Sequence, residues 1–211
     1  MNKLEQLIKI LDREFPDPKV ELHYKTPLEL LIATILSAQC TDDRVNKVTP
    51  HLFNKYKTAA DYARADPSVL EQEIRSTGFY KNKAKNIIGC GRALVEKHAG
   101  RVPQTMEELV ELPGVWRKTA NVILGNCFGR PAIVVDTHVR RVSQRLGLTR
   151  SDDPDEIETE LGRFIPEKKW TRVSHQLLLH GRHVCKAKNP RCPDCGLKPI
   201  CRYFKQERKA G

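Results

Sequence analysis

The segment from Leu112 to Ile123 reads LPGVWRKTANVI, and it indicates the local fold more clearly than any other stretch. Pro113 and Gly114 favour a tight turn, and the residues after them favour a helix. Free N–H groups at the start of a helix attract an oxyanion such as phosphate, and a glycine lets the backbone approach it closely. The segment therefore predicts a helix–turn–helix that holds a DNA backbone without reading the bases.

Helical patterns also fill most of the remaining chain. The run LELLIATILSAQ, from Leu28 to Gln39, is apolar on nearly all sides and predicts a buried central helix. Periodic apolar positions predict further helices over Asn2–Phe15, Asp42–Tyr56, Ala59–Arg64, Pro67–Ser76, Lys81–His98, Trp116–Cys127, Thr137–Leu146, Asp155–Phe164 and Lys168–His180. Only Ala132–Val135 has the pattern of a strand, and it is too short to build a sheet. We therefore expect an all-α fold.

The composition limits the classes of protein to consider. The 211 residues allow one large domain or two small ones, and 39% hydrophobic residues suffice for a core. There are 37 Lys and Arg residues against 26 Asp and Glu, a net charge of +11. This excess favours an anionic partner, nucleic acid first, although a basic protein without such a partner stays possible.

The chain shows no targeting signal. Its start, MNKLEQLIKILDREF, mixes both signs of charge through its apolar positions, unlike a secretory signal. There is no run of 18 apolar residues, so no membrane span is expected. We expect the protein in the reducing cytoplasm, where crowded cysteines are more often metal ligands than disulfides.

Four of the seven cysteines crowd into the last 27 residues, separated by six, two and five residues. They are Cys185, Cys192, Cys195 and Cys201. Four thiolates on a short loop can hold zinc or an iron–sulfur cluster, and the spacing alone leaves both open. Neighbouring lysines and arginines would offset the negative charge of such a centre.

Lys118 stands just inside the predicted second helix of the helix–turn–helix. The positive end of that helix and Arg117 both favour the neutral amine, which is a nucleophile able to form a Schiff base. Local chemistry alone favours the simpler role of a lysine that pairs with a phosphate.

Asp136 follows the apolar run Ala132–Val135 and precedes Thr137. Its default role is to cap the next helix. A carboxylate fixed in this way could also steer a lysine nucleophile, and the two roles are compatible.

Together these motifs resemble the endonuclease III family of DNA glycosylases. The resemblance covers nearly the whole chain, and the order of the motifs and the spacing of the cysteines agree with the family. The matching segments are LLIATILSAQCTDDRVN (Leu30–Asn46), STGFYKNKAKNI (Ser76–Ile87), LPGVWRKTANVI (Leu112–Ile123), VVDTHVRRVSQRLG (Val134–Gly147), LLLHGRHVC (Leu177–Cys185) and the four-cysteine loop.

The resemblance implies a helix–hairpin–helix fold in two all-α domains. A six-helix domain would cover residues 21–131. Residues 1–20 and 132–211 would form a discontinuous iron–sulfur domain, with DNA against the cleft between the two. The four cysteines would then hold a [4Fe–4S] cluster rather than zinc.

The resemblance also implies an activity: removal of oxidised pyrimidines from double-stranded DNA, with cleavage at the abasic site. Lys118 matches the catalytic lysine of the family, which attacks the sugar of a flipped nucleotide and forms an imine. β-Elimination then nicks the strand. Asp136 matches the catalytic aspartate, which would stabilise positive charge on the sugar and manage the proton of the lysine.

Two residues resemble the pair with which the family probes the duplex. Gln39 matches the residue that fills the space left by the flipped nucleotide, and Phe79 lies in the loop that wedges between bases of the other strand. The remaining expected DNA contacts are Gly114, Val115, Trp116, Arg117, Thr119, His138, Lys186, Lys188 and Arg191.

One residue departs from the pattern of the family. The hairpin usually reads Gly-Val-Gly, but Trp116 stands in place of the second glycine. A tryptophan would be costly there if its φ were positive. We expect weaker or altered DNA binding, or a tryptophan that lines the lesion pocket.

Two other functions compete with this one. An adenine-type glycosylase without lyase action would generally lack a lysine at position 118 and would commonly be longer. A non-enzymatic DNA-binding protein with a zinc or iron clip is the alternative from another class. We expect a monomer that works on the nucleoid.

Overall fold

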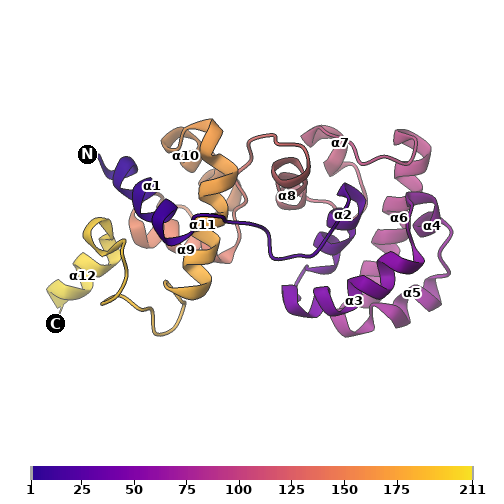
Figure 1. Cartoon of the computed structure of the whole chain (residues 1–211), viewed down its shortest axis with the longest axis horizontal. Helices are drawn as coiled ribbons and strands as arrows, with labels where there is room; N and C mark the ends of the chain where they lie inside the picture. Colours follow the sequence, from indigo (N-terminus) through magenta and orange to yellow (C-terminus); the bar gives the residue numbers. More distant parts are fainter. Residues whose placement is uncertain (1, 211) are drawn as a thin grey trace. The chain divides into compact units, whose positions relative to one another are not determined.

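The computed structural model describes the backbone of residues 2–210 and the side chains of residues 2–206. The chain folds as two compact units. One is Glu21–Arg130, and the other joins the segment that ends at Val20 to the segment that begins at Pro131. Both units are helical (Figure 1), and no strand occurs between residues 2 and 210. The expected all-α fold class is confirmed.

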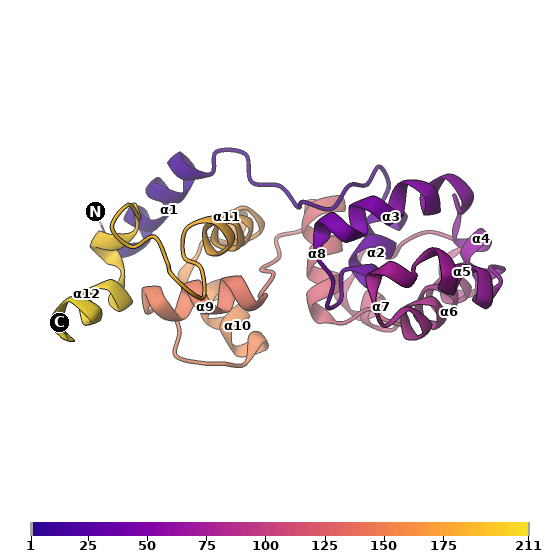
Figure 2. The same cartoon turned by 90° about the horizontal axis from the view of Figure 1, so that it is seen from below.

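The unit Glu21–Arg130 is built around one buried helix. Its elements are α2 (Pro27–Leu36), α3 (Asp42–Lys55), α4 (Ala59–Ala63), α5 (Pro67–Glu73), the 3-10 helix η1 (Arg75–Thr77), α6 (Tyr80–His98), α7 (Met106–Val110) and α8 (Arg117–Cys127). Helix α2 contacts α3, α6 and α8, and Figure 2 shows it among them. Every residue from Leu30 to Leu36 is buried, so the predicted central helix is confirmed. The helix ends three residues before Gln39, whose φ of 52° does not continue an α-helix.

Helices α7 and α8 form the predicted helix–turn–helix. The N–H of Leu112 donates to Leu109 O at 3.1 Å, and the N–H of Val115 donates to Leu112 O at 3.0 Å. Gly114 has φ +78°, and a Cβ at this position would lie 2.8 Å from the Cβ of Asn86. Only glycine fits both the conformation and the space. The side chain of Val115 is 3% exposed and fastens the turn to the core, and its expected contact with DNA stays a prediction.

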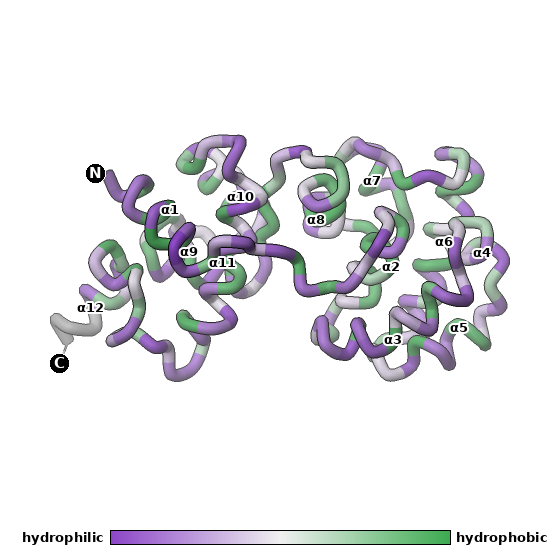
Figure 3. Tube along the Cα trace, in the orientation of Figure 1, coloured by the Kyte–Doolittle hydropathy of each residue, from purple (hydrophilic) through white to green (hydrophobic). Residues whose placement is uncertain are grey.

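The second unit packs its N-terminal helix against the C-terminal half of the chain. Its elements are α1 (Lys3–Glu14), α9 (Thr137–Leu146), α10 (Pro154–Phe164), η2 (Glu167–Lys169), α11 (Trp170–His183), η3 (Lys198–Ile200) and α12 (Arg202–Ala210). Leu7 and Leu11 of α1 are fully buried in a core shared with α9, α10 and α11. Asp12 accepts hydrogen bonds from Arg172 at 2.8 Å and Gln176 at 2.9 Å, which link α1 to α11. Along α1, α9 and α11, hydrophobic residues recur among hydrophilic ones (Figure 3), as expected for helices that bury one face.

The short strand predicted over Ala132–Val135 is wrong. The segment is buried but pairs with side chains of α11 instead of with another strand. The N–H of Val134 donates to Ser174 Oγ at 2.8 Å, and Ser174 Oγ donates in turn to Val134 O at 3.0 Å. The N–H of Ala132 donates to Thr171 Oγ1 at 3.1 Å. Hydroxyl groups therefore satisfy backbone groups that a β-ladder would otherwise have to satisfy.

Candidate functional site

Lys118 is the second residue of α8 and its side chain is exposed. Within the described part of the chain, its Nζ atom has no hydrogen bond or ion pair. No side chain caps α8, because the N-cap residue is Trp116, whose indole offers no hydrogen-bond acceptor. The first turn of α8 therefore presents backbone N–H groups and a free amine at the same place, which suits an anionic ligand.

Trp116 does not strain the hairpin. Its φ of −107° and ψ of 170° are extended values that any residue adopts. The backbone strain that a tryptophan would suffer at a positive φ is therefore absent. The side chain is 79% exposed, which is unusual for so large an apolar group. It stands two residues before Lys118 in the chain. The expected role of Trp116 in DNA contact stays a prediction.

Asp136 is the N-cap of α9, as predicted. Its Oδ1 atom accepts hydrogen bonds from the N–H groups of His138 and Val139, both at 2.8 Å. These bonds fix the carboxylate on the helix end, and its other oxygen accepts no hydrogen bond from any described residue. Asp136 is half-buried and belongs to the unit that begins at Pro131, whereas Lys118 belongs to Glu21–Arg130.

His138 has a local structural partner. Nη2 of Arg141 lies 3.0 Å from His138 Nδ1 and donates to it, since a guanidinium cannot accept. Burial lowers the pKa of His138, and Arg141 and Arg182 lower it further while Asp136 opposes them. The imidazole is held by Arg141 of its own helix and by a backbone hydrogen bond at Gly181 of α11.

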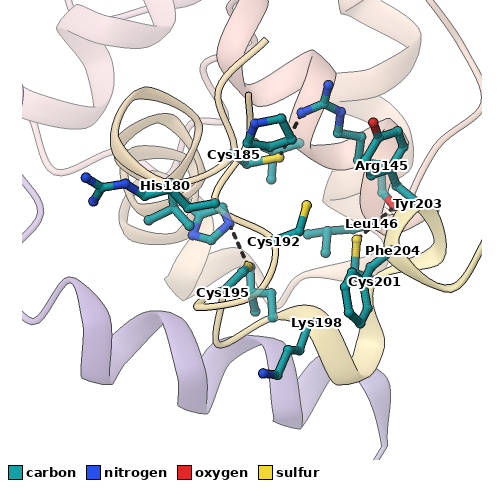
Figure 4. A pocket seen from close by; sticks show the side chains of 15 residues that line it. Arg145, Leu146, His180, Cys185, Cys192, Cys195, Lys198, Cys201, Tyr203 and Phe204 are labelled. Atoms are coloured by element: carbon teal, nitrogen blue, oxygen red, sulfur yellow. Dashed lines mark hydrogen bonds between the residues drawn. The ribbon is translucent and has the colours of Figure 1, made fainter. Parts of the chain in front are cut away.

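The four clustered cysteines line one pocket (Figure 4). Cys185 follows α11, Cys192 and Cys195 lie in the next loop, and Cys201 precedes α12. The pocket contains about 380 Å³ of space, part of it open to solvent. All seven cysteines of the chain are free thiols. Among the described residues, no three His, Cys, Asp or Glu side chains stand close enough together to hold a single metal ion.

Two residues that sequence reasoning missed support this pocket. Arg145 Nη1 donates to Cys185 Sγ at 3.4 Å and to Lys186 O at 2.8 Å. Its guanidinium also lies 4.6 Å from the ring centroid of Tyr203. Arg141 Nε donates to Cys185 O at 3.0 Å. The sequence contains many arginines. The only sequence signal that could have identified Arg141 and Arg145 is their spacing, which places them on one face of α9.

His180 lies on the other side of the pocket (Figure 4). Its Nε2 atom is 3.6 Å from Cys195 Sγ, and its Nδ1 atom is 3.4 Å from Glu14 Oε2. Burial lowers the pKa of His180 to about 4, and burial raises the pKa of the Cys195 thiol to about 11.

Three cationic residues predicted to contact DNA stand on the cysteine loop. Lys186, Lys188 and Arg191 are all exposed. The loop is held at its start by Arg141 and Arg145, and the N–H of Arg191 donates to Val184 O at 3.0 Å. The pocket therefore shapes a loop whose outer surface is basic.

Gln39 and Phe79 share an unusual backbone conformation. Their φ angles are 52° and 48°, in the left-handed region that non-glycine residues rarely adopt. Both side chains are exposed, Phe79 by 63%. Strained residues of this kind gather at functional sites, where surrounding contacts hold them in place. Sequence patterns gave no indication of the strain, because neither residue is of a type that signals it.

Comparisons with known proteins agree on one family. Residues 32–167 match the HhH-GPD superfamily of base excision DNA repair proteins. Endonuclease III of Synechocystis sp. is 52% identical over 197 residues, which cover 93% of this chain and 90% of the relative. The Bacillus subtilis enzyme is 46% identical over 215 residues, covering 100% of this chain and 98% of the relative. This chain belongs to the endonuclease III family.

Solved structures of endonuclease III extend the agreement to the fold. A trapped endonuclease III–DNA covalent intermediate matches with a TM-score of 0.92 and 48% identity, over 99% of this chain and 100% of that one. A non-covalent endonuclease III–DNA complex matches with the same TM-score and 47% identity. A thermostable thymine-DNA glycosylase, at 23% identity and a TM-score of 0.82, shares the fold.

The family confirms the predicted general function: the chain is a DNA glycosylase of base excision repair. It also confirms the resemblance drawn from the sequence motifs. Among the described helices, none is long and apolar enough to cross a membrane. The roles expected of individual residues stay predictions.

Proposed function

We propose that this endonuclease III family member removes oxidised pyrimidines from double-stranded DNA and then cleaves the abasic strand through a Schiff base on Lys118. The observation that carries the proposal is the exposed, unpaired amine of Lys118 in the uncapped first turn of α8. A structural lysine on a protein surface has no need of such a position, whereas a nucleophile needs access to its substrate.

The proposed reaction begins with the damaged nucleotide turned out of the duplex. Lys118 Nζ attacks C1′ of the sugar, the bond from C1′ to the base breaks, and the base leaves with a proton. Opening of the sugar ring at O4′ gives an imine between Nζ and C1′. Loss of a proton from C2′ then expels the 3′ phosphate, and water hydrolyses the imine. The solved relative that was trapped covalently on DNA supports a covalent route.

Asp136 would assist this chemistry from its fixed place at the start of α9. Its Oδ1 atom is occupied by two helix N–H groups, and the remaining oxygen would face the positive charge that develops on the sugar. The same carboxylate would accept a proton from the Lys118 ammonium and so generate the nucleophile.

The exposed side chains of Gln39 and Phe79 would open the duplex. An apolar ring such as that of Phe79 can unstack a base step, and the amide of Gln39 can fill the space of an extruded nucleotide. Trp116, Arg117 and Thr119 at the start of α8 would contact the DNA backbone, together with Gly114 of the turn.

The four cysteines fit a [4Fe–4S] cluster better than a zinc ion. A single zinc ion needs all four sulfurs about 2.3 Å from one point. Here the thiols are spread around a pocket, and no three of them are grouped for one ion among the described residues. A cluster in which each iron takes one thiolate suits that arrangement. When bound, it would serve as a structural clip, because cysteines fill every ligand position.

The loop that such a cluster folds would present cations to the DNA. Lys186, Lys188 and Arg191 are exposed along it and would contact phosphates. Arg141 and Arg145 connect the loop to α9, the helix that Asp136 caps.

We further propose that the enzyme acts as a monomer on the nucleoid. Light scattering would check the oligomeric state, and a fluorescent fusion would check the location.

Borohydride trapping tests the central claim. The protein is incubated with duplex DNA that contains thymine glycol or an abasic site, and borohydride then reduces the imine to a stable adduct. We expect an adduct with the parent and none with Lys118→Gln. Lys85→Gln removes the same charge from an exposed lysine of α6 and should trap like the parent.

The outcomes separate the alternatives. Release of the base without an adduct would favour a monofunctional glycosylase, and binding without release would favour a non-enzymatic DNA-binding protein. An adduct that persists in Lys118→Gln would overturn the assignment of the nucleophile. A brown protein with broad visible absorption would support iron and sulfur, whereas a colourless zinc-containing protein would contradict the cluster.

A further inference from the structure

Lys83 is a buried lysine without an acidic partner. It lies on the inner face of α6 and is only 4% exposed, the only lysine or arginine that is buried among residues 2–206. Burying an ammonium group is unfavourable unless hydrogen bonds replace its water. No carboxylate pairs with it in the described part of the chain, so a role in a salt bridge does not explain its position.

Its hydrogen bonds go to two backbone carbonyls far apart in the sequence. Nζ donates to Leu36 O at 2.7 Å and to Thr77 O at 2.8 Å. Leu36 is the last residue of α2, and Thr77 is the last residue of η1. The bonds are charge-assisted and short, which makes them stronger than bonds between neutral groups. Burial lowers the pKa of Lys83 while Cys40 opposes that change, and the two carbonyls favour the charged form.

Each of these carbonyls lies two or three residues before a strained residue of the proposed duplex-probing pair. Gln39 follows Leu36 by three residues with φ 52°, and Phe79 follows Thr77 by two residues with φ 48°. A left-handed non-glycine residue persists only where its surroundings hold it. A single ammonium group thus fastens the start of both loops.

We propose that Lys83 is a positioning residue that ties the Gln39 loop (residues 37–40) to the Phe79 loop (residues 78–80). The side chains of Gln39 and Phe79 then meet the duplex in a fixed arrangement. The inference rests on the proposed function, because it needs these two side chains to open the DNA. An arrangement prepared in the free enzyme lowers the entropy that must be lost when DNA binds. Loss of the tie should therefore impair opening of the duplex and leave the chemistry at Lys118 intact.

The test compares three variants in three measurements. Lys83→Met keeps most of the length of the side chain without its donors, Lys83→Arg keeps charge and donors in another shape, and Lys85→Met is an exposed control on the same helix. The measurements are excision of thymine glycol from duplex DNA, borohydride trapping on single-stranded abasic DNA, and amide hydrogen exchange of the two loops. Single-stranded DNA needs no opening, so trapping on it reports chemistry alone.

For Lys83→Met we expect duplex excision to fall about tenfold while trapping on single strands changes less than about twofold. Peptides covering residues 37–40 and 78–80 should exchange faster together, with the rest of the chain unchanged. Lys83→Arg should lie between Lys83→Met and the parent, because a guanidinium keeps charge and donors but is longer, planar and bulkier than the ammonium group that this buried space holds. Lys85→Met should match the parent in every measurement.

Two results would overturn the proposal. One is duplex excision by folded Lys83→Met at the rate of the parent. The other is an equal loss on duplex and single-stranded DNA, which indicates a merely structural role. If Lys83→Met does not fold, Lys83→Arg decides: loops that exchange as in the parent, or unchanged duplex excision, reject the proposal. If the parent itself forms no adduct, the proposed function fails, and loop exchange alone still decides whether Lys83 ties the loops.

Discussion

Replacement of Asp136 separates its two roles. As a helix cap, residue 136 needs an acceptor oxygen at the position of Oδ1, and asparagine also supplies one. As a catalytic group, it needs a negative charge, which asparagine lacks. Asp136→Asn should therefore keep the fold and lose excision, whereas Asp136→Ala should lose both the cap and the charge.

The expected magnitudes follow from the contacts. Asp136→Ala removes an acceptor that bonds two N–H groups at 2.8 Å, and loss of such a cap costs about 1 kcal/mol. Asp136→Asn keeps the acceptor and loses only the attraction of a half-exposed charge to the helix end, about 0.5 kcal/mol. For a chain of 211 residues, 1 kcal/mol corresponds to a shift in Tm of about 2–4 °C. Both variants should lower the excision rate about 100-fold or more.

The assay combines thermal unfolding with single-turnover excision of thymine glycol. Asp153 offers a matched control, because its Oδ1 atom caps α10 through Asp155 N–H at 2.9 Å and Glu156 N–H at 3.0 Å. Asp153→Ala should cost as much stability as Asp136→Ala and leave excision unchanged. Normal excision by Asp136→Asn would refute the catalytic role. If Asp136→Asn lost as much stability as Asp136→Ala, the account of the cap would be wrong.

Three further predictions concern the hairpin and the cysteine loop. Gly114→Ala should lower the free energy of unfolding by about 2 kcal/mol, measured with urea, because φ is +78° and the new Cβ would meet Asn86 at 2.8 Å. Trp116→Gly should lower excision of thymine glycol more than trapping at abasic sites, because the exposed ring would contact the lesion and not the nucleophile. Cys195→Ala should first lose visible absorption and the helical signal of its unit, and should lose DNA affinity as a consequence. Absorption spectra, circular dichroism and DNA-binding assays would measure these losses.

Each of these has a clear contrary result. Unchanged urea unfolding of Gly114→Ala would mean that the turn relaxes without cost. Equal affinity and equal trapping by Trp116→Gly would remove any role for the ring in DNA binding. A Cys195→Ala protein that stayed folded and bound DNA normally would contradict the structural clip.

Local sequence determined much of the site. The Pro113-Gly114 turn, the position of Lys118 at the start of a helix and the cap at Asp136 are all set by neighbours within a few residues. The four cysteines stand on one short segment, so their spacing predicted a shared pocket. The family resemblance added the expected roles of Gln39 and Phe79 in probing the duplex, which no local pattern suggests.

The fold class, the central helix and the hairpin were thus within reach of the sequence alone, because helical periodicity and turn residues act over single turns of chain. The tertiary structure decided the rest. It replaced the expected strand at Ala132–Val135 by hydroxyl contacts from α11, and it bonded Lys83 to Leu36, 47 residues away. It also placed Gln39 and Phe79 in left-handed conformations. These features depend on backbone groups that distant segments bring together, and backbone carbonyls carry no signal in a sequence.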